Sequence, residues 1–176
     1  MGFFRGKQAE TSVWRRFRSG HEGFTFVKEG DHFSAHVVTN AERTLELFRQ
    51  LMGYLPPAVD VAVDDRRARH KWSGTGVALS AVQDAIGIVS AGLVKTGGIE
   101  VAVYTTDDQL TLNPQLELFI YARSDRWLYL LVGAGLEERT FVPTRSWKFS
   151  RRDFGPAPEL SEALAAMATR LGLHSG

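Results

Sequence analysis

Residues 80–95 constrain the fold more than any other part of this chain of 176 residues. At helical spacing, Val82, Ile86, Val89 and Leu93 fall on one side, and the opposite side is mostly alanine, isoleucine and glycine. A membrane span needs roughly 20 apolar residues and would not tolerate an aspartate near its centre. We therefore expect a core helix that is covered nearly all round, by its own chain or by a partner.

Apolar and polar residues alternate in several other segments, as they do in strands. Residues 23–28 and 32–38 are joined by Glu29-Gly30-Asp31, which predicts a hairpin. Val59, Val61 and Val63 predict a strand with one buried face. Residues 99–105 also have strand character.

Two further segments, 115–122 and 126–132, are apolar on both alternating faces. This composition is typical of central strands, which are covered on both sides of a sheet. The short connection from Arg123 to Arg126 predicts that these two strands pair antiparallel.

Capping residues predict where the helices begin. Thr39 and Glu42 have the spacing of a capping box before a helix that ends at Gly53, and Ser80 and Gln83 have the same spacing. A basic loop containing glycines, residues 66–76, is expected before the second of these helices. A final helix is predicted to begin at Pro158 and to end before Gly172, with leucine and methionine at helical spacing.

This order of elements predicts a single α+β domain, residues 21–176, with helices packed on a mostly antiparallel sheet. Residues 1–20 are expected to form a basic amphipathic N-terminal arm. The absence of cysteine excludes disulfides, thiolate zinc sites and a cysteine nucleophile. We expect a cytoplasmic protein with no transmembrane span, because no secretory apolar segment is present. The excess of arginine over lysine and the frequent alanine favour a bacterial source.

Positive charge is bunched among aromatic rings, although 21 basic residues nearly balance 20 acidic ones. The candidate anion- or partner-binding residues are Arg66, Arg67, Arg69, Lys71, Trp72, Arg145, Trp147, Lys148, Arg151 and Arg152. If they share one face, they could bind phosphates while the rings stack on bases. Alternatively, the tryptophans fix loops to the core and their basic neighbours keep those edges soluble. Residues 66–76 lack the glycine spacing of known phosphate loops.

The N-terminal arm is a second candidate surface, because Phe3, Phe4, Trp14 and Phe17 lie among basic residues. Such a segment can lie on an anionic membrane or dock into a partner. The alternative is that it folds back onto its own sheet.

Catalytic and metal-binding patterns are weak. His32 and His36 would lie roughly 13 Å apart on a strand, too far to share an ion. The pairs Asp64-Asp65 and Asp107-Asp108 occur where turns begin, which favours turn chemistry over acid–base work. We expect no catalytic residue, no metal and no cofactor.

The function that this sequence favours is a non-catalytic protein–protein interaction module that self-associates or binds a protein partner, as an adaptor, immunity or chaperone-like subunit. The alternative is a polyanion- or nucleic-acid-binding protein that uses the basic clusters. A small enzyme with an unrecognised site is the third possibility.

Overall fold

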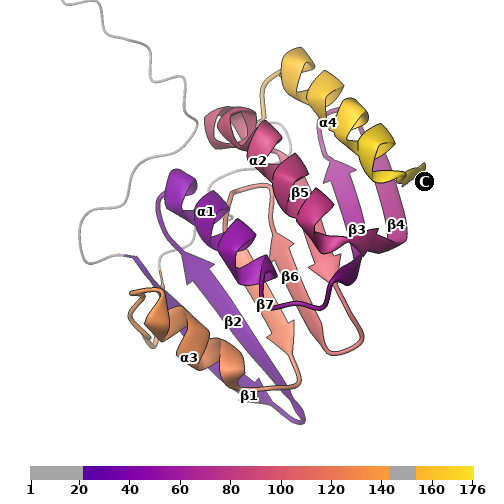
Figure 1. Cartoon of the computed structure of the whole chain (residues 1–176). Coiled ribbons are helices and arrows are strands. Elements are labelled where there is room, and N and C mark those ends of the chain that lie inside the picture. The colour runs from indigo at the N-terminus through magenta and orange to yellow at the C-terminus, as the bar shows by residue number, and fades with distance from the viewer. Residues whose placement is uncertain (1–21, 143–153) are drawn as a thin grey trace, which may run out of the picture.

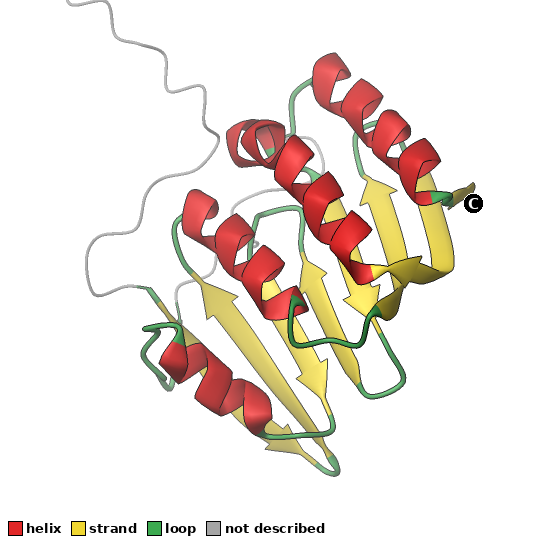
Figure 2. Ribbon diagram, in the orientation of Figure 1, coloured by secondary structure: helices red, strands yellow, loops and turns green. Residues whose placement is uncertain are grey.

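The computed structural model describes residues 22–142 and 154–176. Within these ranges, four helices lie on one face of an eight-stranded antiparallel sheet (Figures 1 and 2). The strands follow the order β1-β2-β7-β6-β5-β3-β4-β8 across the sheet. The predicted α+β domain with helices packed on an antiparallel sheet is confirmed.

The elements have the following bounds. The helices are α1 Ala41–Met52, α2 Leu79–Thr96, α3 Arg126–Gly133 and α4 Pro158–Leu171. The strands are β1 Gly23–Glu29, β2 His32–Val38, β3 Ala58–Asp65, β4 His70–Ala78, β5 Ile99–Tyr104, β6 Asp108–Leu112, β7 Leu118–Ala122 and β8 His174–Ser175. The predicted first hairpin, the strands at 59–63 and 99–105 and the final helix are confirmed.

The first two helices begin within two residues of the predicted starts, but their N-cap residues differ from the predicted ones. The N-caps are Asn40 and Ala78, and neither makes a side-chain cap hydrogen bond. The carboxylate of Glu22 accepts the Asn40 amide instead, at 2.8 Å. Gln83 donates its side-chain amide to the Arg49 carbonyl of α1 at 2.9 Å, because the two helices are neighbours. At Gln83 a tertiary partner has therefore taken the place of the predicted local one.

Residues 126–132 form the helix α3, so the predicted strand there is wrong. Trp127 and Leu131, one helical turn apart, are buried, whereas Tyr129 between them is exposed. Strand β7 pairs with β2 and with β6, a strand that was not predicted. A short apolar run does not by itself distinguish a strand from a helix.

Residues 70–78 continue a hairpin from β3 as the strand β4, so the predicted loop over 66–76 is also wrong beyond its first four residues. The structure explains why two positions of β4 are glycine. A Cβ on Gly74 would lie 2.7 Å from the Leu173 side chain, and Gly76 has a φ of +63°. Strand pairing and close packing against the chain end outweigh the low strand propensity of glycine.

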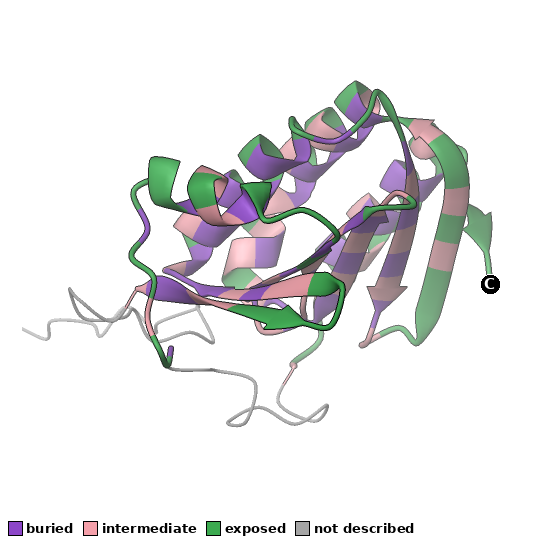
Figure 3. Ribbon diagram, turned by 90° about the horizontal axis from the view of Figure 1, so that it is seen from below, coloured by how far each residue is buried: buried purple, intermediate pink, exposed green. Residues whose placement is uncertain are grey.

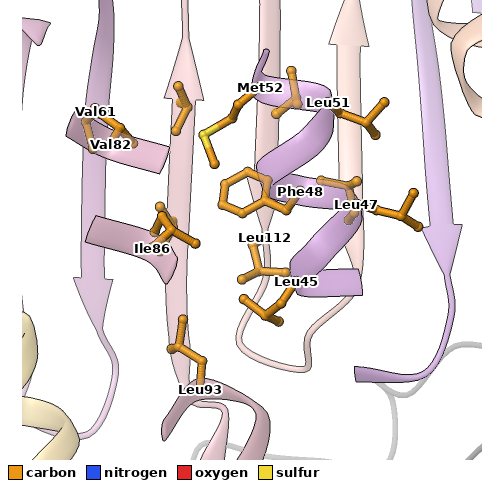
Figure 4. Packing of buried hydrophobic residues seen from close by; sticks show 14 of the residues in the cluster. Leu45, Leu47, Phe48, Leu51, Met52, Val61, Val82, Ile86, Leu93 and Leu112 are labelled. Atoms are coloured by element: carbon orange, nitrogen blue, oxygen red, sulfur yellow. The ribbon is translucent and has the colours of Figure 1, made fainter. Parts of the chain in front are cut away.

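The core lies between the sheet and the helices (Figures 3 and 4). Val82, Ile86, Val89 and Leu93 of α2 are all buried, and α2 also packs against α1 and α4. Its exposed stripe retains one large apolar side chain, Ile88, which is 60% exposed. Since the described chain itself covers α2, this helix gives no reason to expect a partner.

Candidate functional site

Arg67, in the basic segment that follows β3, makes hydrogen bonds within its own chain. Arg67 donates to the Thr96 and Gly97 carbonyls at the end of α2, and to the Gly155 carbonyl at 2.7 Å. Burial lowers the pKa of Arg67, while nearby Asp65 acts in the opposite direction. These contacts satisfy helix-end carbonyls that would otherwise lack donors. They leave the guanidinium little capacity for a ligand.

The neighbours of Arg67 are also engaged. Arg66 lies 3.1 Å from Asp64 and 2.9 Å from Glu100, and the Lys71 ammonium lies 3.8 Å from Asp64. These four side chains line a hollow of about 580 Å³ in which two carboxylates balance two cations. Such a hollow attracts an anion only weakly, because its own charges cancel.

The remaining residues of this cluster are Arg69 and Trp72. Arg69 lies in the turn before β4 with a φ of +53° and is exposed. Trp72 is partly buried against the core, and the His70 ring lies 4.3 Å from it. This placement fits the alternative in which a tryptophan fixes an edge to the core. Arg145, Trp147, Lys148, Arg151 and Arg152, and likewise Phe3, Phe4, Trp14 and Phe17, lie outside the described residues.

The buried carboxylate of Asp65 makes structural contacts. Asp65 accepts the amides of Arg67 and Ala68 at 3.0 and 3.1 Å and the Ser161 hydroxyl at 2.8 Å. It thereby holds the β3–β4 turn and the start of α4, as turn chemistry predicts. In residues 22–142 and 154–176, no three histidine or acidic side chains gather as potential metal ligands.

A groove with a mostly apolar lining lies between α1 and α3, the two helices nearest β1 and β2 on the helix face (Figure 1). We call it the α1–α3 groove. Its volume is about 480 Å³. It is lined by Gln50, Leu51, Gly53, Tyr54, Tyr129, Leu130, Gly133 and Ala134. None of these lining residues carries a carboxylate, an imidazole or an amine.

An arginine bridges the two helices at each end of this groove. Arg43, near the start of α1, donates to the Ala134 carbonyl after α3 at 3.4 Å. Arg126, at the start of α3, donates to the Tyr54 carbonyl after α1 at 3.2 Å. The two helices therefore run antiparallel, and the bridges hold them in place while the space between them stays open.

The start of α3 is fixed through Trp127. Its indole donates to Asp108 at 2.8 Å, the Tyr54 ring meets it edge-on at 6.5 Å, and the Arg126 guanidinium lies 5.0 Å from its ring centre. The outward side of α3 is exposed to solvent. Tyr129 is 68% exposed and Val132 is 53% exposed.

Sequence reasoning did not identify this groove, because it predicted one of its two walls as a strand. A signal was present: no charged residue occurs between Arg126 and Glu137, which is unusual for a surface segment. Among the described helices, none is both long enough and apolar enough to cross a bilayer. No family model, curated protein or solved structure matches the chain.

Proposed function

We propose that this protein is a non-catalytic, cytoplasmic interaction module that self-associates through the α1–α3 groove, as an adaptor, immunity or chaperone-like subunit would. One observation carries the proposal. Large exposed apolar side chains gather at this groove: Tyr54 and Tyr129 line it, and Val132 follows on the outward side of α3. Exposed apolar surface of this kind marks sites of protein contact.

The chemistry of the lining favours binding over catalysis. The groove volume of about 480 Å³ falls within the range of ligand pockets. General acid–base catalysis, however, most often uses histidine, glutamate or aspartate, and the lining contains none of these. The lining offers apolar surface, two phenol groups and one amide, which together suit the side chains of a partner segment.

Polyanion binding receives less support. Arg66, Arg67 and Lys71 already bind carboxylates or helix-end carbonyls of their own chain. Releasing them for phosphate would break these contacts. A protein partner at the α1–α3 groove requires no such change.

Gly133 provides a position for a test. A Cβ there meets nothing within 4 Å, so the larger side chain of Gly133→Leu starts in open space beside the groove and should occupy part of it. In sedimentation velocity, we expect wild-type protein to associate as its concentration rises, and Gly133→Leu to remain monomeric. Gly133→Ala, which hardly fills the groove, is the matched control and should associate. A wild-type protein that stays monomeric up to near-millimolar concentration would refute self-association.

A further inference from the structure

The described chain begins at one end of the α1–α3 groove. Glu22, its first residue, accepts hydrogen bonds from the Asn40 amide at 2.8 Å and from Arg43 at 2.9 Å. A second nitrogen of Arg43 reaches Ala134, which lines the groove. Residues 1–21 therefore join the fold about one arginine side chain away from the groove.

The charges beside the groove favour a cationic occupant. Arg43 is paired with Glu22 at 2.9 Å, and Arg126 is paired with Asp108 at the same distance. Glu46 on α1 is different, because its partner among the described residues is the uncharged side-chain amide of the groove residue Gln50, which donates at 3.1 Å. No described arginine or lysine forms an ion pair with Glu46 in residues 22–142 and 154–176. A suitable ligand combines apolar side chains with flanking positive charge.

Residues 1–21 lie outside the described residues, but their sequence has this chemistry. Phe3, Phe4, Trp14 and Phe17 provide large rings, and Trp14 is followed directly by Arg15-Arg16. Tryptophan and arginine are the residues most enriched at the energetic centres of protein interfaces. The segment matches the groove in both its apolar and its charged parts.

We propose that the α1–α3 groove binds the aromatic, basic segment 1–21 of a second copy of this chain. This inference rests on the proposed self-association. Tyr129 and Val132 are exposed, and a second molecule bound at the groove would cover them. A symmetric exchange fills both grooves with the same contact, as closed homodimers require.

Mixing two full-length variants tests the exchange. The first is Gly133→Leu, which blocks the groove and keeps the segment. The second carries Trp14→Ser and Phe17→Ser, which remove the rings and keep the groove. Each variant alone should lose the dimer seen for the wild type. Their mixture should recover a one-to-one dimer, weaker than the wild-type dimer because only one of two contacts remains.

The outcomes separate this inference from the proposed function. If the wild type and the Trp14→Ser, Phe17→Ser variant dimerise equally well, the groove has another occupant and the inference fails while self-association stands. If the wild type dimerises but the mixture does not, the exchange between copies is also refuted. A monomeric wild type refutes both proposals. Ile88→Ser, which alters an exposed apolar side chain on α2, should leave the dimer unchanged. Circular dichroism checks that each variant is folded.

Discussion

The indole N–H of Trp127 donates a hydrogen bond of 2.8 Å to the buried carboxylate of Asp108. Arg126 binds the other oxygen of the same carboxylate at 2.9 Å. One acidic side chain of β6 thus holds the first turn of α3 and with it one wall of the α1–α3 groove. This pair makes the groove depend on a contact in the core.

Asp108→Ala should lower the free energy of unfolding by about 2–4 kcal/mol, because it leaves a buried indole N–H and an arginine without their acceptor. Urea denaturation followed by circular dichroism measures the change. Asp107→Ala is the matched control, since that carboxylate is largely exposed, and it should change the stability by less than about 0.5 kcal/mol. Equal effects from both substitutions would mean that the Trp127 contact contributes little.

Ile86→Ala should cost about 2–4 kcal/mol of stability, because it removes buried methyl groups from the face of α2 that packs on the sheet. Ile88→Ala, two residues later on the exposed stripe, should cost less than about 0.5 kcal/mol. The same denaturation experiment compares the two. Similar losses at both positions would contradict the orientation of α2.

Arg67→Ala should destabilise the fold by about 1–3 kcal/mol, since the carbonyls at the end of α2 lose their donors. Thermal melting measures the effect, with Arg69→Ala as an exposed control that should change little. If Arg67→Ala melts with the wild type, these contacts do not stabilise the helix end.

Heparin affinity chromatography tests the polyanion alternative. Because Arg66, Arg67 and Lys71 contact groups of their own chain, we expect wild type and Arg69→Glu to elute together at low salt. A retained wild type that Arg69→Glu releases early would instead support phosphate contacts at this turn.

Much of the architecture follows from local patterns. The hairpin of β1 and β2 follows from alternation around Gly30, whose φ of +65° suits the turn. Helix α2 follows from the spacing of Ile86, Val89 and Leu93. These predictions are correct because the spacing of apolar residues along one helix or strand is enough to show which side chains are buried.

The features of the structure that could not be predicted from the sequence depend on contacts between residues far apart in the chain. Helix α3 was predicted as a strand because both alternating sets of residues 126–132 are apolar. The hydrogen bond from Trp127 to Asp108, which joins α3 to β6, cannot be read from that local pattern. The glycines before α2 indicated a loop, whereas Gly74 lies in a strand and pairs with Val61 of β3. The sequence around Arg67 indicates an anion site. In the fold, Arg67 instead contacts the end of α2, about 30 residues away in the chain, and the sequence does not reveal this contact.

Amide hydrogen exchange, measured at low and high protein concentration, tests the central claim most directly. If the protein self-associates through the α1–α3 groove, peptides that cover α3 and the end of α1 should exchange more slowly at high concentration. Peptides that cover β4 should exchange at the same rate in both samples and provide the internal control. Unchanged exchange in α3, in a sample that sedimentation shows to be associated, would contradict the claim and place the contact elsewhere on the molecule.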